Sequence, residues 1–413
     1  MSKTAPVVSL DDVSVHFEES TGLFDFRSEP DRVRAVDGVS LDIYSGDVVV
    51  LVGESGCGKT TLGRTAIGVQ RPTAGSVTYR GQNIWDAREN NGDVDIEFEK
   101  IRRSLQMVHQ DPGSALNPNQ KVIATLSAPL EKWHSDLSKE ERHERVFELL
   151  DTVGVQPVED YAFRYPHQLS GGEQQRIALI RSLLLNPDLV LGDEAVSALD
   201  VSLRVDMMDL MLDLRERFET SFLFISHDLA NARYLAEKAD GRIGIMYLGE
   251  LVEIGPADQI IKQPKHPYTK VLKWATPSIH SDDDGRSIDT PVREIDIPDP
   301  VDPPAGCRFH TRCPVAREAC TKEAPDLLDV AGSGQRTACF RQDSTHEYWN
   351  SPELDGTDDR IQQELISDGQ YSFRIDLIFI NRTASRACIV SRLARVLTHD
   401  RCVYHARNGS NND

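Results

Sequence analysis

Gly53-Glu54-Ser55-Gly56-Cys57-Gly58-Lys59-Thr60 is the stretch that decides the fold, because it matches the phosphate-loop pattern G-x-x-x-x-G-K-S/T. It follows a short, β-branched apolar run at residues 48–52, which predicts a strand buried on both faces, and it precedes a helical stretch. In that setting main-chain N–H groups and the start of the helix attract phosphate. The loop therefore predicts a nucleoside triphosphate site, and a chance glycine-rich turn is the alternative.

Each side chain of the loop has an expected role. Lys59 is expected to reach the β- and γ-phosphates, and the Thr60 hydroxyl to hold Mg²⁺. Cys57 is expected to be structural, since phosphate contact does not need its side chain. The residues expected to contact the nucleotide here are Gly53, Glu54, Ser55, Gly56, Cys57, Gly58, Lys59, Thr60 and Thr61.

Two further stretches support a triphosphatase. Leu189-Val190-Leu191-Gly192-Asp193-Glu194 predicts a buried strand that ends in two carboxylates, with Asp193 near Mg²⁺ and Glu194 as the general base. An apolar run followed by two acids is common by chance, so the surrounding sequence matters. Leu169-Ser170-Gly171-Gly172-Glu173-Gln174-Gln175 lies upstream, at a loop-to-helix junction rich in N–H donors.

Together with Ser197-Ala198-Leu199-Asp200 and His227, these motifs resemble the ABC ATPase family over about residues 7–340. The resemblance implies an α/β fold: a P-loop NTPase core of the ABC type, an antiparallel β edge subdomain and an inserted α-helical subdomain, followed by a small Cys-rich C-terminal segment. Residues 7–17 alternate apolar and polar side chains and predict an edge strand, and residues 123–150 predict a helical stretch.

The resemblance also assigns roles that the residues alone do not carry. Gln110 is implied to be the glutamine that senses Mg²⁺ and the membrane partner, and His227 the histidine that contacts the γ-phosphate. Phe17 is implied to stack on adenine, although a phenylalanine in a strand is more often plain core. The residues implied to complete the nucleotide sites are Ser170, Gly171, Gly172, Asp193 and Asp200.

Two positions depart from the family pattern. The signature motif of the family corresponds here to residues 169–173, and it usually ends in Gln. Glu173 stands at that last position, and we expect it to be tolerated because an acid favours a helix N-terminus. Ala195 follows Glu194 where the family usually has Pro, which loosens one turn. The family mechanism implies two cassettes facing head to tail, so that Ser170 and Gly172 serve the partner's ATP.

A second cluster of chemistry lies near residues 306–340, where Cys307, Cys313, Cys320 and Cys339 follow the spacing C-x5-C-x6-C-x18-C. In a reducing cytosol such grouping indicates metal or cluster ligation more than disulfides. The spacing alone leaves Zn²⁺ and an iron–sulfur cluster open, because it is neither a paired zinc-ribbon nor a ferredoxin pattern.

Here a narrower resemblance adds information. Phe309-His310-Thr311-Arg312-Cys313-Pro314 and His266-Pro267-Tyr268-Thr269 resemble the C-terminal region of oligopeptide and dipeptide importer ATPases. That resemblance implies a 4Fe-4S cluster on the four cysteines, with Zn²⁺ as the alternative. It also implies that this chain is the F-type ATPase of a heterodimer, paired with a paralogous ATPase. The other implied partners are two permease subunits and an extracellular substrate-binding protein.

Composition narrows the partners. The formal charge of −20 argues against a broad nucleic-acid surface, since phosphate binding needs a positive field. No stretch reads as a signal peptide, and the apolar runs fall short of the ~20 residues that span a bilayer. The chain is expected at the cytoplasmic face of the membrane, held there by its partners.

The expected division of the chain is an ABC ATPase domain over 1–275, with the helical subdomain at about 111–187, a linker over 276–305, the Cys-rich segment over 306–340 and a tail over 341–413. Beyond about residue 366 the tail contains arginine but no lysine, and Cys388 and Cys402 are expected to be bystanders. A lineage-specific extension and a reading-frame change both remain open for it.

The expected function is therefore ATP hydrolysis that powers di- or oligopeptide import. The alternatives are import of nickel or sugars by the same architecture, and a soluble ABC ATPase acting on nucleic acid or ribosomes.

Overall fold

The computed structural model describes residues 5–18, 32–109, 111, 113, 116–276, 292–293, 296–330 and 332–354. The chain divides into two compact units, Met1–Gln362 and Gln363–Asp413, and the second lies wholly outside the described residues. Gln110, Cys388, Cys402, most of the expected linker and most of the expected tail also lie outside them.

The larger sheet of the described chain has eight strands in the order β11-β12-β10-β9-β3-β8-β7-β6. From β6 to β9 all neighbouring strands are parallel, and β10, β12 and β11 continue the sheet antiparallel. The strands are β3 Val48–Val52, β6 Leu105–Val108, β7 Leu189–Asp193, β8 Ser221–Ser226, β9 Arg242–Tyr247, β10 Glu250–Pro256, β11 Leu328–Asp329 and β12 Arg336–Thr337.

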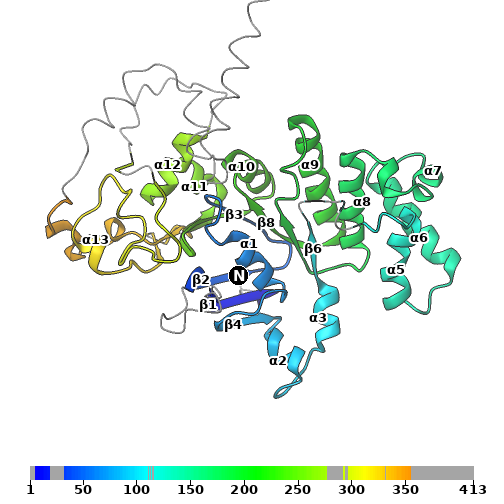
Figure 1. Cartoon of the computed structure of the whole chain (residues 1–413), viewed down its shortest axis with the longest axis horizontal. Helices are drawn as coiled ribbons and strands as arrows, with labels where there is room; N and C mark the ends of the chain where they lie inside the picture. The colour runs from blue at the N-terminus through cyan, green and yellow to red at the C-terminus, as the bar shows by residue number, and fades with distance from the viewer. Residues whose placement is uncertain are drawn as a thin grey trace, which may run out of the picture. The chain divides into compact units, whose positions relative to one another are not determined.

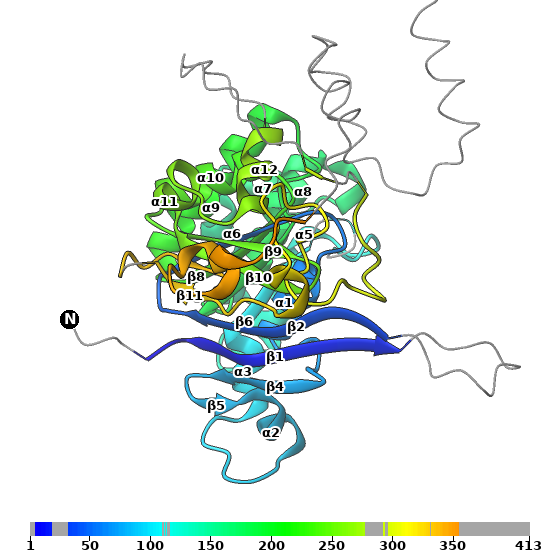
Figure 2. The ribbon, with the colours of Figure 1, turned by 90° about the vertical axis from the view of Figure 1, so that its left-hand side faces the viewer.

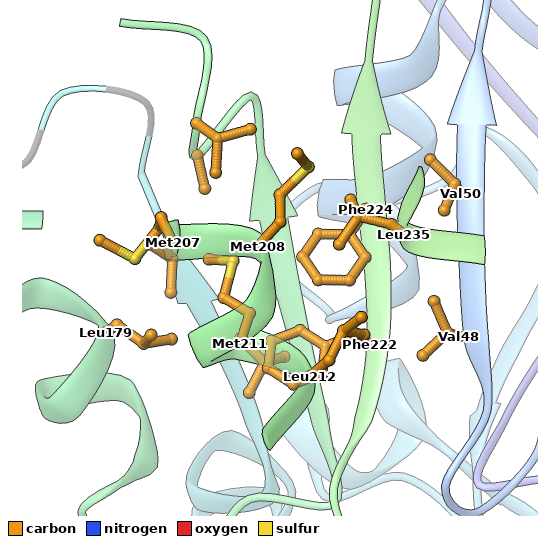
Figure 3. Packing of buried hydrophobic residues seen from close by; sticks show 14 of the residues in the cluster. Val48, Val50, Leu179, Met207, Met208, Met211, Leu212, Phe222, Phe224 and Leu235 are labelled. Carbon is orange, nitrogen blue, oxygen red and sulfur yellow. The ribbon is translucent and has the colours of Figure 1, made fainter. Parts of the chain in front are cut away.

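The centre of this sheet is apolar on both faces, as the sequence predicts. All residues of β3 are buried, and so are all residues of β7 and β8. Figure 3 shows one face, where Met207, Met208 and Met211 of a covering helix lie over Phe222 and Phe224. The expected α/β core with a strand before the phosphate loop is therefore confirmed.

A second sheet has four antiparallel strands in the order β2-β1-β4-β5. The strands are β1 Val8–Glu18, β2 Arg32–Ile43, β4 Ala74–Tyr79 and β5 Gln82–Asn83. Figure 2 shows β1, β2 and β4 layered along one side of the larger sheet. The prediction of an edge strand at residues 7–17 is wrong, because β1 lies between β2 and β4 and pairs with both. Alternation of apolar and polar side chains shows that one face of a strand is buried, but it does not show the position of that strand in the sheet.

The helix that follows the phosphate loop, α1 (Lys59–Ala66), lies between the two sheets. Leu62 and Ala66 are buried in one apolar cluster with residues of both sheets, such as Val15 and Leu191. Packing on both sides explains why the loop at its start has a fixed position.

The helical stretch predicted at 123–150 is interrupted. The chain forms α5 and α6, with Ser138 starting α6 through a capping box with Glu141. Figure 1 shows α5 to α7 gathered away from the sheets. The remaining helices are α2 Ile84–Glu89, α3 Phe98–Ser104, α5 Val122–Trp133, α6 Lys139–Thr152, α7 Val158–Ala162, α8 Gly171–Leu183, α9 Val201–Phe218, α10 Leu229–Lys238, α11 Ala257–Lys262, α12 Pro267–Ala275, α13 Ala319–Lys322 and the short 3-10 helices η1 Pro166–Gln168, η2 Phe340–Gln342 and η3 Glu347–Asn350.

The Cys-rich segment does not form a separate sheet. Its strands β11 and β12 extend the larger sheet through β10, and Tyr348 beyond it is buried against Ala319 and Cys320. Across the described residues no helix is both long and apolar enough to span a bilayer.

Candidate functional site

The phosphate loop connects β3 to α1, and two of its glycines are required by close contacts. A Cβ at Gly53 would lie 2.2 Å from the carbonyl oxygen of Met246. Gly58 has a φ of +103°, and a Cβ there would lie 1.9 Å from the carbonyl oxygen of Ala35. No other residue type fits these two positions, so the loop is forced into one tight path.

Lys59 is buried and turned back over its own loop. Its Nζ donates to the carbonyl oxygens of Gly53 and Glu54, each at 2.8 Å, and lies 3.7 Å from the Cys57 sulfur. Burial raises the pKa of the Cys57 thiol, which supports its expected structural role. The ammonium group thus lies at the centre of the curl, where the sequence places a phosphate.

Thr60 and Asp193 meet across the gap between α1 and the end of β7. The Thr60 hydroxyl donates to Asp193 Oδ1 at 2.9 Å, and Arg64 Nη2 lies 3.5 Å from Asp193 Oδ2. A hydroxyl and a buried carboxylate offer the hard oxygen donors that Mg²⁺ prefers, so these two residues fit the expected metal. They lie 133 positions apart in the sequence.

Glu194 and His227 extend the row of polar groups at the carboxyl ends of the strands. Because β7 and β8 are parallel neighbours, the residues after them are adjacent, and Glu194 Oε1 lies 3.2 Å from His227 Nδ1. Glu194 has a φ of +50°, a left-handed conformation that is uncommon for a glutamate and frequent at active sites. The Gln175 amide of α8 donates to the carbonyl of Ala195 at 2.5 Å, which ties this turn to the signature helix.

Ser170 is the N-cap of α8. Its Oγ accepts from the Glu173 N–H at 3.3 Å, and its own N–H donates to Glu173 Oε2 at 2.7 Å, which makes a capping box. Tyr161 OH donates to Glu173 Oε1 at 2.6 Å. Although partial burial raises the pKa of Glu173, these hydrogen bonds prevail and lower it. Glu173, which replaces the usual Gln of the signature, therefore helps to cap the N-terminus of α8.

The signature glycines start the same helix, and they are not joined to the phosphate loop. Within the described residues, no hydrogen bond or ion pair connects Ser170, Gly171 or Gly172 to residues 53–60.

Three more residues, Asp200, Phe17 and Gln110, were predicted to serve the nucleotide site. Asp200 is the N-cap of α9, accepting from the Leu203 N–H at 3.1 Å and the Ser202 hydroxyl at 3.0 Å, and the Leu203 bond foremost lowers its pKa. Phe17 lies near the end of β1 with 42% of its surface exposed, so its ring is open to a planar ligand. Gln110 lies outside the described residues.

The sequence did not predict which residues support the phosphate loop on the side away from the nucleotide. The Glu54 carboxylate forms a buried two-pronged ion pair with Arg312, and the Glu54 N–H donates to Tyr268 OH at 3.0 Å. Both partners were noticed only as parts of family motifs. The available signal was an acidic residue inside a loop that binds anions, since such a charge requires a partner.

The four predicted cysteines line one small cavity. His266, Phe309 and Phe340 are among the other residues of its wall, and all four cysteines are free thiols. Burial raises the pKa of Cys313 to about 12 and that of Cys339 to about 11, while the main-chain N–H groups of Val315 and Arg341 act in the opposite direction by hydrogen bonding to them.

Such N–H donors favour thiolates, the form that binds soft metals, but burial outweighs them here, so it is the presence of four sulfur donors in one cavity that suits a metal or cluster. Among the described residues, however, no group of three or more His, Cys, Asp or Glu side chains has a geometry that could hold a metal ion as it stands.

Comparison with known proteins finds family matches for two parts of the chain. The family model "ABC transporter" matches residues 36–197, and the model "Oligopeptide/dipeptide transporter, C-terminal region" matches residues 252–320. The chain is similar to the di/tripeptide transport ATP-binding protein DppF of Pseudomonas aeruginosa, at 42% identity over 78% of this chain and 94% of the relative. The oligopeptide transport ATP-binding protein AppF of Bacillus subtilis is 40% identical, over 79% of this chain and 95% of the relative.

Solved structures agree on the fold. The ATP-binding cassette MJ0796, in a dimeric post-hydrolysis state bound to ADP and Pi, aligns with a TM-score of 0.50 at 29% identity, covering 60% of this chain and 98% of the cassette. The protein cbiO1 from Clostridium perfringens aligns with a TM-score of 0.51 at 20% identity, over 65% of this chain and 96% of that one.

Proposed function

The chain belongs to the ABC transporter family and carries the oligopeptide/dipeptide C-terminal region, and from this premise we propose that it is the ATP-hydrolysing subunit of a di- or oligopeptide importer. The observation that carries the proposal is the row of Lys59, Thr60, Asp193, Glu194 and His227 at one edge of the larger sheet. This row has the groups that ATP hydrolysis requires, and the C-terminal region directs the activity to peptide transport.

Each residue of the row has a defined part in hydrolysis. Lys59 exchanges its two bonds to loop carbonyls for bonds to the β- and γ-phosphates when ATP binds. Thr60 and Asp193 would hold Mg²⁺, which would supply positive charge beside the phosphates. Glu194 takes a proton from the attacking water, and His227, hydrogen bonded to it, orients that carboxylate and contacts the γ-phosphate.

The signature residues act on a second cassette. Ser170 and Gly172 start α8, where free N–H groups and the helix dipole attract phosphate, and in the described part of the chain no hydrogen bond or ion pair joins them to the phosphate loop. A head-to-tail pair of cassettes puts each signature against the other's ATP. The partner we propose is a paralogous ATPase, so that closure on ATP and reopening after hydrolysis move the membrane subunits.

The permease subunits have a candidate docking surface. A groove of about 1210 Å³ lies between the sheet core and the inserted helices, lined among others by Arg102, His109, Gly113, Leu116 and Trp133. It adjoins the segment that contains Gln110, the residue implied to sense the membrane partner. Contact at this groove would hold the chain at the cytoplasmic face of the membrane.

The Cys-rich segment is proposed to hold a 4Fe-4S cluster, with Zn²⁺ as the competing occupant. The shared cavity and the N–H groups directed at the thiols support ligation by Cys307, Cys313, Cys320 and Cys339. Iron and zinc analysis after anaerobic purification separates the two, and stoichiometric zinc without iron would reject the cluster.

The domain division proposed from the sequence is kept with one qualification. An ATPase domain over 1–275, including an antiparallel β subdomain and a helical subdomain at about 111–187, accounts for the nucleotide machinery. The segment over 306–340 adds its strands to that domain's sheet. It is therefore proposed to fold with the ATPase domain and not apart from it.

Uptake in cells tests the function. Cells lacking the gene should regain uptake of a labelled dipeptide when supplied with the wild-type chain, and should not regain it with Glu194→Gln. Restored uptake of Ni²⁺ or a sugar, but of no peptide, would favour the alternative cargoes. A chain that stays out of the membrane fraction and binds RNA would favour the soluble ATPase, against which the net charge of −20 argues.

A further inference from the structure

Glu54 has both its side chain and its main-chain N–H held by residues from beyond the ATPase motifs. Its carboxylate oxygens lie 2.9–3.1 Å from Arg312 Nη1 and 3.1 Å from Arg312 Nη2, and the Arg312 side chain is only 2% exposed. The two residues are 258 positions apart. Although burial disfavours its charge, the bonds to Glu54 raise the pKa of Arg312, so the guanidinium keeps its charge in this buried position.

Tyr268 holds the main chain at the same residue. Its hydroxyl oxygen accepts from the Glu54 N–H at 3.0 Å, and the side chain is fully buried in α12. The ring packs against Tyr247 and Phe309, with centroid distances of 4.7 Å and 5.3 Å. His266 starts α12 by accepting the Tyr268 N–H at 3.1 Å, so the position of this hydroxyl is set by a capped helix and an aromatic cluster.

A second arginine of the Cys-rich segment supports the loop near its middle. Arg308 donates to the carbonyl oxygen of Leu248 and pairs with Asp37 and Glu250. Gly249, which follows Leu248 in the sequence, donates its N–H to the carbonyl of Cys57 at 2.9 Å. The loop is therefore supported near its start by Arg312 and near its middle through the turn that Arg308 holds.

We propose that Arg312 and Tyr268 are positioning residues for nucleotide binding, which hold the phosphate loop from behind and neutralise Glu54. The physical reason is twofold. A loop whose N–H groups bind a triphosphate works best when its main chain is already in the binding shape, because ordering it on binding costs affinity. An unpaired carboxylate in that loop would also repel phosphate and attract Lys59, whose Nζ already bonds to the Glu54 carbonyl.

The test compares Arg312→Met with Arg317→Met in the full-length chain, using a β,γ-imido analogue of ATP and Mg²⁺ in calorimetric titrations. Arg317 belongs to the same segment but pairs with the exposed carboxylate of Glu353 and with main-chain carbonyls near Tyr348. We expect Arg312→Met to raise the Kd of the analogue about tenfold, since it leaves a buried carboxylate unpaired. Arg317→Met should stay within about twofold of wild type, a change that is worth less than one hydrogen bond.

A second variant guards against misfolding or loss of metal in Arg312→Met. Tyr268→Phe lies outside the Cys-rich segment, keeps the aromatic packing and removes only the acceptor of the Glu54 N–H. We expect it to raise the Kd about threefold, as for the loss of one neutral hydrogen bond. For both variants the KM for ATP should rise, while kcat, measured at saturating ATP, should change less than about twofold. A residue that only supports folding would behave differently, because its loss would lower the active fraction, and with it the apparent kcat, without changing KM.

The outcomes are distinct. The proposal rests on ATP binding at this loop, so a wild-type chain that fails to bind the analogue would reject the proposed function itself. If the wild type binds, and Arg312→Met and Tyr268→Phe both bind within twofold of it, the positioning role is overturned. An equal loss of affinity in Arg317→Met would overturn it as well, since the effect would then belong to the segment as a whole.

Discussion

The two sides of the phosphate loop are built in different ways. The side facing the nucleotide site uses the loop's own residues and the ends of neighbouring strands: Lys59 donates to the Gly53 carbonyl, and Thr60 donates to Asp193. The opposite side is held by Tyr268 and Arg312, more than 200 positions away. The difference teaches that the chemistry of the site depends on the phosphate loop and the strand ends beside it, whereas its support comes from α12 and from the Cys-rich segment.

The two sides also differ in how their polar groups are satisfied. At the front, Glu194 and His227 keep part of their surface exposed, with side chains 24% and 51% accessible, as groups that exchange partners must. At the back, Glu54 and Arg312 are 7% and 2% accessible and pair with each other. We therefore expect front substitutions to change rate or affinity, and back substitutions to change affinity or stability without changing the chemistry.

The largest effect is expected at the front, for Glu194→Gln. Loss of the general base should lower kcat by about 10²–10⁴-fold while ATP binding is kept, because the substitution preserves size and hydrogen bonding. Steady-state ATPase rates and analogue titrations measure the two quantities. Glu237→Gln on α10, an exposed acid that pairs with Arg233, is the control and should retain full turnover.

Lys59→Ala should have the next largest effect, and on affinity. Removing a charged donor at the centre of the loop should raise the Kd for Mg-ATP about 10–100-fold, the range for charge-assisted hydrogen bonds. Calorimetry measures it, with Lys262→Ala as control, since Lys262 is exposed and pairs with Asp258 on the surface of α11. Unchanged affinity in Lys59→Ala would contradict the assignment of the front side.

At the back, Cys313→Ser should act on metal content and stability. Losing one of four ligands should reduce bound iron or zinc and lower the thermal midpoint by several degrees, on the order of 1–2 kcal/mol of stability. Elemental analysis and thermal unfolding measure these. Cys388→Ser serves as the matched thiol control; an equal loss of metal in that variant would show that the four-cysteine cavity is not the metal site.

The smallest effect is a pH dependence at the signature helix. Hydrogen bonds from Tyr161 and Ser170 outweigh partial burial and lower the pKa of Glu173 in the folded chain. Its contribution is therefore present above the ordinary carboxylate pKa and is lost as pH falls through the lower folded value. The stability difference between wild type and Glu173→Gln should shrink as pH falls below about 4.5, the ordinary value of a glutamate. A difference that grows instead would contradict the capping role.

Much of the site was predictable because it depends on short-range patterns. The strand at residues 48–52, the glycines of the loop and the acids after β7 all follow from local burial and turn geometry. The meeting of Thr60 with Asp193 was predictable as well, because both residues were expected at Mg²⁺ and parallel strands place their carboxyl ends together.

Other features were not predictable from local patterns. The place of β1 inside its sheet was missed because alternation shows which face is buried, not which strands lie on either side. The break between α5 and α6 was missed although Ser138 and Glu141 carry a capping signal. The partners of Glu54 were missed because its position in the loop accepts any residue, and nothing nearby in the sequence indicates where its charge is paired.

By itself the sequence determined that this protein binds a nucleoside triphosphate on a P-loop α/β core and that four cysteines accompany that core, because glycine spacing, apolar runs and thiol spacing are local properties of the chain. Only the tertiary structure decided that β11 and β12 continue the core sheet and that Arg312 and Tyr268 support the phosphate loop. The physical reason is that a buried charge can be paired by any residue that folding brings within about 3 Å, whatever its distance along the chain.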